Sequence, residues 1–253
     1  MNTIPLSILI PVYNRTEELI RCISSIANQS VVPSEIIVYD DGSDIEIKSC
    51  IDNIQDLNIL YVRNSLNNGV SFARNQLLSL AKNNYVLFID SDDEFNLFDS
   101  IETFFKTIIE NDDITFAVSY NLIYDIRKNK LLRKSIRPKI PFTELTVNNF
   151  IKEIYGYFPM IINKKKLNNV RFDEYLKIKL EDNDFVFNIF VNGGKGIRIN
   201  KPLGKYNMGS PYSLTIKKGK YIKKLYNNYL TEKYKDLNQS EEIRKTANII
   251  INR

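Results

Sequence analysis

The sequence has no histidine and only two cysteines among its 253 residues. The absence of histidine excludes Ser-His-Asp triads, HExxH zinc sites and a histidine general base. Cys22 and Cys50 form no CxxC pair, and both fall in expected helices. A disulfide framework or a cysteine zinc site is therefore not expected, and a reducing compartment is the default. Acid–base chemistry must rest on carboxylates, lysine, tyrosine or cysteine.

The sequence also lacks a long apolar run and a strong net charge. No stretch approaches the ~18 residues that a membrane-spanning helix requires, and residues 1–6 lack the charged and apolar parts of a signal peptide. We therefore expect a cytoplasmic protein, with peripheral binding to the inner face of the cytoplasmic membrane left open. The net charge of +5 is mild. It does not require nucleic acid as a partner, and it fits an anionic substrate or lipid surface.

The first part of the chain alternates between apolar strand patterns and helical patterns. Strands are predicted at 6–12, 35–39, 58–62 and 85–89, and helices at 17–28, at 44–54 with Ser43 as a candidate cap, and at 70–82. This order indicates an α/β fold built on a doubly wound parallel sheet. Ligands bind such sheets beyond the carboxyl ends of the strands, where the polar clusters of this sequence lie.

The later part of the chain is less regular. Helices are predicted at 97–110 and 182–192, and strands at 114–125, 158–163 and 196–199. The chain from Lys217 onward has a helical pattern and is rich in lysine. We therefore divide the chain into a catalytic domain at 1–215 and a basic helical tail at 216–253.

Asp90-Ser91-Asp92 directly follows the fourth predicted strand. Two carboxylates one residue apart at a strand end can point at the same ion, and hard oxygen ligands suit Mg²⁺ or Mn²⁺. Such a metal neutralises charge that builds on a departing diphosphate. A solvated acidic turn is the alternative, but the apolar strand delivers the cluster to the ligand edge of the sheet.

Three further motifs each have a functional and a structural interpretation. Asp41, in the Asp-Asp-Gly-Ser turn after the second strand, is placed to accept the N3–H of a uracil or to form an Asx turn. Arg74 lies on the first turns of a helix, where it can reach a diphosphate or remain exposed. Glu181-Asp182 opens another helix, and these residues are either a catalytic base or ordinary partners of the helix dipole.

Two basic segments suggest an anionic membrane surface as a partner. A basic, aromatic and amphipathic helix can lie on such a surface, and a solvated lysine-rich face is the equal alternative. The segments contain Arg127, Lys128, Lys130, Arg133, Lys134, Arg137 and Lys139, and then Lys217, Lys218, Lys220, Lys223 and Lys224 interleaved with Tyr221, Ile222, Leu225, Tyr226 and Tyr229.

Taken in order, these motifs resemble the family 2 glycosyltransferases of the GT-A fold. The resemblance is strong over residues 4–95, thinner to about residue 215 and absent after that. The motifs that carry it are Pro11-Val12-Tyr13-Asn14, Asp40-Asp41-Gly42-Ser43, Asn68-Gly69 with Ala73-Arg74-Asn75, Phe88-Ile89-Asp90-Ser91-Asp92-Asp93, and Glu181-Asp182.

The resemblance implies a mixed sheet flanked by helices, a UDP-sugar donor, Mn²⁺ or Mg²⁺ as cofactor, and an inverting reaction. It implies that Asp182 is the base with Glu181 beside it, and that Asp92 binds the metal with Asp90. The nucleotide-sugar contacts that it implies are Pro11, Tyr13, Asp41, Arg74, Asp90 (on the ribose) and Ser91.

The chain departs from the family pattern at several points. Ile45 stands where the family often has a further aspartate, with Asp44 next to it, and Tyr206-Asn207-Met208 contains neither the arginine nor the histidine that is frequent there. We therefore assign no diphosphate contact to that segment. The QxxRW motif of processive polysaccharide synthases is missing, so a synthase of that type is not expected.

We interpret the sequence as a metal-dependent hexosyltransferase that transfers a hexose or N-acetylhexosamine. The expected acceptor is a saccharide on a polyprenyl diphosphate, in bacterial O-antigen or other surface polysaccharide synthesis. A nucleotidyltransferase would have a GxGTR-type loop after the first strand, and a dinucleotide oxidoreductase would have GxGxxG there; this chain has Pro-Val-Tyr-Asn-Arg. A catalytically silent sugar-nucleotide-binding module or membrane scaffold is the alternative from another class.

Overall fold

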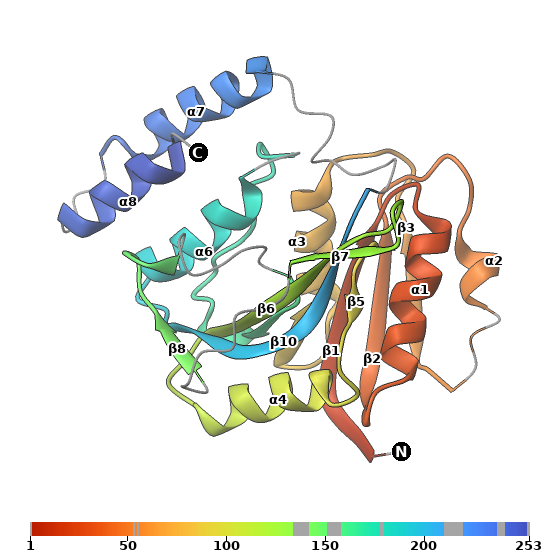
Figure 1. Cartoon of the computed structure of the whole chain (residues 1–253). Coiled ribbons are helices and arrows are strands. Elements are labelled where there is room, and N and C mark those ends of the chain that lie inside the picture. The colour runs from red at the N-terminus through yellow and green to blue at the C-terminus, as the bar shows by residue number, and fades with distance from the viewer. Residues whose placement is uncertain are drawn as a thin grey trace.

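The computed structural model describes residues 2–52, 54, 56–133, 142–150, 158–177, 180–209, 220–236 and 241–251. Within these residues the chain forms a ten-stranded sheet with helices on both faces (Figure 1). The strand order is β3-β2-β1-β4-β9-β6-β10-β5, with β7 beside β6 and β8 beside β10. The expected α/β fold, a mixed sheet flanked by helices with a helical tail, is confirmed.

The first four strands in sequence order form the parallel part of the sheet. They are β1 (Asn2–Val12), β2 (Val31–Asp40), β3 (Ile59–Arg63) and β4 (Tyr85–Phe88), and they alternate with α1 (Thr16–Ala27), α2 (Lys48–Ile51) and α3 (Val70–Leu80). All seven elements were predicted, and their order is the strand–helix alternation that the apolar pattern indicated.

The predicted helix at 44–54 is wrong over most of its length. It is reduced to α2, whose N-cap is Ile47 and not Ser43. The Ser43 hydroxyl accepts the backbone N–H of Asn14 at 2.9 Å, and the Asp44 N–H donates to the side chain of Asn14 at 2.8 Å. These groups tie the turn after β2 to the turn after β1, so they do not start a helix.

The remaining strands make the sheet mixed, as the family resemblance implied. The antiparallel strand β9 (Met160–Asn163) lies between β4 and β6 (Phe116–Asp125), and β6 pairs in parallel with β10 (Gly196–Met208). Three short strands pair antiparallel with β10 or β6: β5 (Glu94–Phe95), β7 (Lys130–Arg133) and β8 (Phe142–Leu145). Antiparallel neighbours such as β6 and β7 need only a short turn between them, whereas parallel neighbours need a longer crossover.

Strand β10 is much longer than the predicted strand at 196–199. Its pairing with β6 continues through register shifts on both sides of Pro202, which has no backbone N–H to donate. These irregularities break the period of two that the sequence pattern relies on. Further helices that the described residues outside the tail form are α4 (Ser100–Glu110), α6 (Glu181–Val191) and the short 3₁₀ helix η1 (Lys164–Lys166), and α4 and α6 lie close to their predicted bounds.

Each face of the sheet has its own apolar core. On β1, Ile8 and Ile10 face the core under α1, α2 and α4, whereas Leu9 faces the core under α3 and α6. Both sets of side chains are fully buried. This burial on two faces explains why the strand reads as a continuous apolar run and not as an alternating one.

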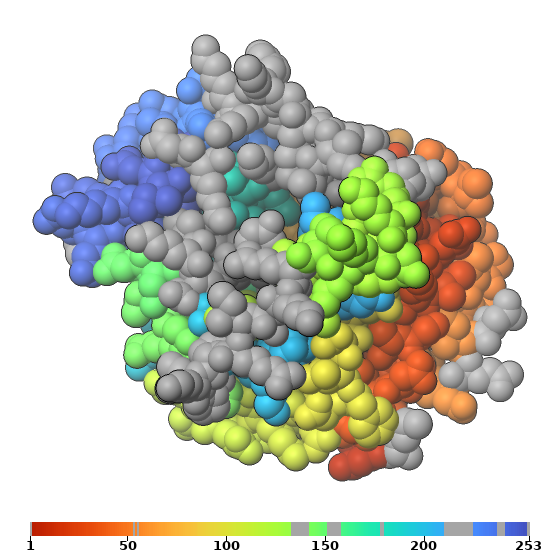
Figure 2. Space-filling view, viewed as in Figure 1, coloured from red at the N-terminus to blue at the C-terminus, as the bar shows by residue number. Residues whose placement is uncertain are grey.

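The C-terminal helices pack on the core that lies under α3 and α6. Helix α7 (Lys220–Tyr234) contributes Tyr226 and Leu230 to that core, and α8 (Glu241–Ile251) contributes Ala247 and Ile250. Figures 1 and 2 show both helices, in blue, on the α6 side of the molecule. The predicted boundary between residues 215 and 216 lies outside the described residues. Within the parts that are described, no helix combines the length and apolarity needed to cross a bilayer.

The packing of α7 predicts that a core residue on this helix stabilises the whole fold. Leu230 is fully buried, whereas Leu225 on the same helix is 41% exposed. We expect Leu230→Ala to lower the free energy of unfolding by about 2–5 kcal/mol and Leu225→Ala to change it by less than about 0.5 kcal/mol. Urea denaturation followed by circular dichroism measures both, and equal small effects would show that α7 does not share the core.

Candidate active site

Strands β1, β2 and β4 run in parallel, so their carboxyl ends lie at the same edge of the sheet, which is the upper edge in Figure 1, where β1 and β2 end. At this edge Tyr13 is 38% exposed, and Pro11, two residues earlier, is buried in β1. The Asn14 side chain donates to Asp44 at 2.9 Å across the two turns. The turn after β1 is therefore fixed by hydrogen bonds to the turn after β2. The ring of Tyr13 is exposed to solvent, where an aromatic base can stack on it.

The two aspartates after β2 have different structural surroundings. Asp40 is fully buried, and it accepts the Tyr61 hydroxyl at 2.6 Å and the Ser43 N–H at 2.8 Å. The carboxylate of Asp41 accepts the backbone N–H of Asn68 at 3.1 Å and that of Gly69 at 2.7 Å. Asp40 therefore supports the turn, while Asp41 fastens the loop before α3 to it.

Asp41 is almost fully buried in the loop that it holds. Burial raises the pKa of Asp41, and the N–H groups of Asn68 and Gly69 act in the opposite direction. Gly69 has φ +100, and a Cβ there would lie 2.9 Å from the Cβ of Lys177. Only glycine fits this close approach without strain, so the loop that holds Asp41 is tightly determined.

Asp90 and Asp92 lie beyond the end of β4 and each has an arginine partner. Arg74 contacts Asp90 at 2.8 Å, and Arg15 contacts Asp92 at 2.9 Å. Burial raises the pKa of Asp92 to about 6, with repulsion from Asp90 in the same direction and the Arg15 charge in the opposite direction. Concentrated negative charge of this kind favours a bound cation.

The donor set fits a divalent metal that arrives with a phosphorylated ligand. Over the described ranges, no group of three histidine, cysteine, aspartate or glutamate side chains is arranged to hold a metal. Mg²⁺ is commonly bound by one or two carboxylates together with substrate phosphates, and Asp90 and Asp92 supply that number. The Ser91 hydroxyl between them is fully buried and has no hydrogen-bond partner in the described part of the chain.

Arg74 joins the acidic turn after β4 to the start of α6. Its guanidinium contacts Glu181 at 3.1 Å as well as Asp90, and it lies 4.1 Å from the centre of the Phe158 ring. The residue is only 3% exposed, so the interpretation of Arg74 as an exposed helix residue is wrong. The positive charge of Arg74 is paired with the two carboxylates of Asp90 and Glu181. The Nε atom of Arg74 has no hydrogen-bond partner among the described residues.

Glu181 and Asp182 take up different positions in the first turn of α6. Glu181 points to Arg74 and is buried, and burial, followed by repulsion from Asp182, raises the pKa of Glu181 to about 7 against the opposing charge of Arg74. Asp182 is half-buried, and its Oδ1 accepts the N–H of Asn183 at 2.7 Å. Glu181 is thus fixed by an arginine, while the Asp182 carboxylate accepts hydrogen bonds from its neighbour Asn183.

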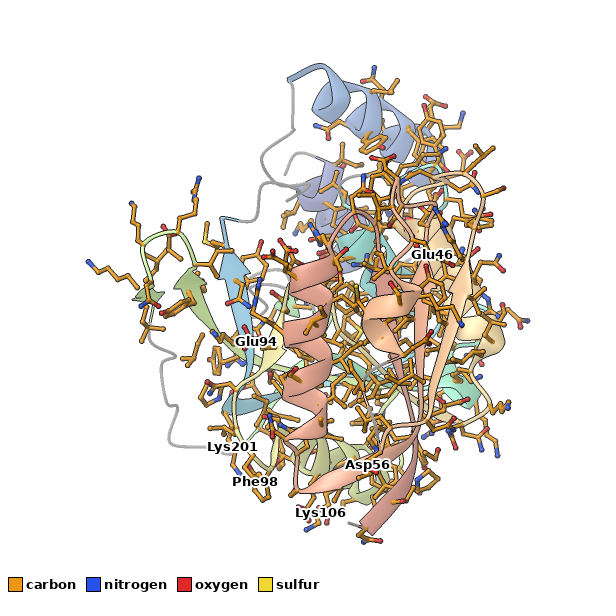
Figure 3. All side chains as sticks on the ribbon, turned by 90° about the vertical axis from the view of Figure 1, so that its right-hand side faces the viewer. Glu46, Asp56, Glu94, Phe98, Lys106 and Lys201 are labelled. Carbon is orange, nitrogen blue, oxygen red and sulfur yellow. The ribbon has the colours of Figure 1, made fainter. Side chains whose placement is uncertain are left out.

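The structure places three residues in the site that the sequence reading missed. They are Arg15, the buried Asp93 and Asn207 of β10. The Asp93 carboxylate accepts the backbone N–H of Asn207 at 3.1 Å, and the Asn207 amide donates to the Asp92 carbonyl at 2.9 Å and to Glu94 at 2.8 Å. Figure 3 labels Glu94, which lies between α1 and β10. In the sequence, Arg15 directly follows Tyr13-Asn14 and Asp93 closes the acidic motif after β4, but neither was assigned a role, and no local pattern marked Asn207 as a contact of that motif.

The basic segments are only partly described. Lys134, Arg137 and Lys139 lie outside the described residues, as do Lys217 and Lys218. The structure also does not describe the side chains of Arg133, Lys220, Lys223 and Lys224. The predicted membrane surface therefore stays a prediction.

A family model described as "Glycosyl transferase family 2" matches residues 7–172. An uncharacterized glycosyltransferase of Methanocaldococcus jannaschii is 30% identical over 88% of this chain and 77% of its own length. A Campylobacter jejuni GalNAc(5)-diNAcBac-PP-undecaprenol beta-1,3-glucosyltransferase is 28% identical over 89% of this chain and 72% of its own. The solved structure of Staphylococcus aureus TarS 1–349 with UDP-GlcNAc has a TM-score of 0.75 at 19% identity, covering 99% of this chain and 70% of that one. The last likeness shows the GT-A fold.

The raised pKa of Glu181 predicts how stability changes with pH. In the unfolded chain this carboxyl titrates near about 4.3, and in the folded chain near about 7. The folded protein binds the extra proton between these values, so the stability that Glu181 contributes is present below about pH 4.3 and is lost as the pH rises through about 7.

In the variant Glu181→Gln the side-chain amide cannot titrate, so the loss of stability with rising pH that Glu181 causes should disappear. Relative to the wild type, the free energy of unfolding of the variant should rise by on the order of 1–3 kcal/mol from about pH 4.5 to about pH 8. Chemical denaturation at several pH values measures the difference. A difference that stays constant across this range would contradict the assignment of a raised pKa to Glu181.

Proposed function

The chain belongs to glycosyl transferase family 2, and on that premise we propose that it transfers a hexose or N-acetylhexosamine from a UDP-sugar to a lipid-linked saccharide. The observation that supports this most is the Asp90–Arg74–Glu181 arrangement. We take the Asp90 side of the buried guanidinium as the candidate phosphate and metal position, and the Glu181 side, where Asp182 is the next residue, as the candidate base position. A sugar between two such positions has its leaving group at one end and its acceptor at the other.

For the donor, we assign the nucleotide to the turns after β1 and β2. The exposed ring of Tyr13 offers a stacking face, Pro11 shapes the turn that carries it, and Asp41 is a hydrogen-bond acceptor at the base of the same edge. A carboxylate that accepts hydrogen bonds suits the N3–H of uracil. The buried hydroxyl of Ser91 and the carboxylate of Asp90 are assigned to the ribose and diphosphate region.

The metal, Mn²⁺ or Mg²⁺, is assigned to Asp92 and Asp90. When bound there, it supplies positive charge that stabilises the diphosphate as it leaves. Arg15 and Arg74 hold the two carboxylates in place from opposite sides. These arginines offset part of the acidic charge, and a metal bound to the two carboxylates would offset more of it.

For the acceptor, we assign proton removal to Asp182 and donor or acceptor contact to Glu181. The acceptor oxygen attacks the anomeric carbon, its proton moves to the Asp182 carboxylate, and the bond from that carbon to the UDP oxygen breaks. Attack from the face opposite the leaving group inverts the anomeric configuration. A carboxylate base is required here because the chain contains no histidine.

The lipid-linked acceptor and a role in surface polysaccharide synthesis rest on two supports. The Campylobacter jejuni relative is named for transfer to an undecaprenol-linked saccharide, and the basic segments of this chain suit an anionic lipid. We also propose peripheral binding to the inner face of the cytoplasmic membrane on the same charge argument. A catalytically silent sugar-nucleotide-binding module is the alternative from another class, and donor turnover separates the two.

The proposal predicts metal-dependent release of UDP. With a GlcNAc-diphosphate-lipid analogue as acceptor and a panel of UDP-sugars as donors, we expect release only when Mn²⁺ or Mg²⁺ is present. Asp92→Ala should lower the rate at least roughly 100-fold, because several kcal/mol of charge stabilisation is lost. Asp182→Asn should lower it by roughly 10²–10⁴-fold, the usual contribution of a general base.

Asp113→Asn is the matched control, because Asp113 is exposed and pairs with Lys195 away from the site. This variant should keep the wild-type rate. UDP release that persists in EDTA, or in both site variants at the wild-type rate, would contradict the assignments. A folded wild type that binds UDP but never releases it from any donor would favour the silent module.

A further inference from the structure

Helix α7 contacts the site's supporting elements through a cluster of polar side chains. The Lys233 ammonium lies 2.6 Å from Asp173 Oδ2 and 2.8 Å from Asp184 Oδ1. The Tyr229 hydroxyl donates to Asp173 at 2.7 Å, and the Tyr234 hydroxyl donates to Asp184. One lysine therefore connects two carboxylates from separate parts of the chain, and each carboxylate has a tyrosine of the same helix as a second partner.

Asp184 is the buried end of this cluster. It is fully inaccessible to solvent and lies in the first turn of α6. Burial raises the pKa of Asp184, and the Lys233 charge and the Tyr234 hydroxyl act in the opposite direction. The Asn188 amide donates to the same carboxylate at 3.1 Å. Because a buried carboxylate that loses its countercharge is strongly disfavoured, Lys233 holds the first turn of α6 in place.

That first turn carries the candidate base. Asp184 follows Glu181 by three residues, and residues three apart lie on the same side of an α-helix. A contact that fixes Asp184 therefore fixes both the rotation and the position of Glu181 and Asp182. Two separate sets of ion pairs therefore meet this turn: one joins Lys233 to Asp184, and the other joins Glu181 through Arg74 to Asp90.

The other partner, Asp173, belongs to the segment that packs against Arg74. The neighbouring Phe172 exchanges two hydrogen bonds with Asn75 of α3, each 2.9 Å long. The Phe172 ring lies 5.4 Å from the Arg74 guanidinium and stacks on Phe185 of α6 with centroids 3.8 Å apart. Lys233 thus joins the two segments that surround the buried arginine.

We propose that Lys233 is a positioning residue for the candidate base, which makes α7 a part of the catalytic unit. The proposal rests on the proposed function of Asp182. In this proposal Lys233 makes no contact with substrate, and the lysine acts through Asp184 and Asp173. A lysine with no positioning role would resemble Lys235, which forms an ion pair with Glu232 in which both side chains are exposed.

Steady-state UDP release by the full chain tests the proposal. We expect Lys233→Met to lower kcat roughly 10–100-fold, because a small displacement of a catalytic group has effects of this size. The donor KM should stay within about 3-fold, since the ion pairs of Lys233 go to Asp173 and Asp184 and not to the turns that carry Tyr13 and Asp41. Lys233→Arg restores the charge and should recover most of kcat, and the control Lys235→Met should match the wild type.

Amide hydrogen exchange provides a readout that does not need turnover. Exchange in the first turn of α6 should be faster in Lys233→Met than in Lys235→Met, because the turn loses its anchor. If Lys233→Met does not fold, Tyr234→Phe replaces it, with a smaller loss of kcat, roughly 2–10-fold, in the same direction.

The outcomes separate the inference from the proposed function. An inactive wild type counts against the proposed function, and the exchange experiment then still decides the positioning role. A wild-type kcat and wild-type exchange in Lys233→Met overturn the inference. A loss of kcat that Lys233→Arg does not recover, with donor KM raised by the same factor, shows a general structural role and also overturns it.

Discussion

The buried guanidinium of Arg74 is the contact on which the geometry of the candidate site depends. It comes from α3, and its two carboxylate partners come from the turn after β4 and from the start of α6. Removing one partner of a buried ion pair typically costs about 3–5 kcal/mol, so these three elements are held at a fixed spacing. The candidate metal position and the candidate base are therefore set relative to each other by one side chain, which lies over Phe158.

Around this contact the site concentrates negative charge and only partly neutralises it. Asp90, Asp92 and Asp93 follow one another closely, and their burial and mutual repulsion raise the pKa of Asp92 and Asp93. Arg15 and Arg74 approach from the β1 and α3 sides and offset part of this charge. A site built this way is best completed by a cation that brings anionic oxygens with it, as a metal–diphosphate does. Helix α7 adds a second set of ion pairs, which join Lys233 to Asp173 and to Asp184 of α6.

How much the sequence predicted depends on how local each feature is. The strands β1 to β4 and the helices between them follow from apolar runs within each segment, and Asp90, Asp92, Glu181 and Asp182 follow from their place at element ends. The Arg74–Glu181 contact joins residues 107 positions apart, and no local pattern records such a pair. The same reason hid the link between α7 and α6. The short strands β5, β7 and β8 were missed because, unlike the four-residue strands β4 and β9, they contain no run of three apolar residues.

The central claim is that the acidic turn after β4 binds a nucleotide diphosphate together with a metal. Calorimetric titration of UDP into the full chain, with and without Mn²⁺, tests it most directly. The account predicts at least roughly tenfold tighter binding with Mn²⁺, about 1.4 kcal/mol, and loss of that difference in Asp92→Ala. Equal UDP affinities with and without Mn²⁺ in the folded wild type would contradict it.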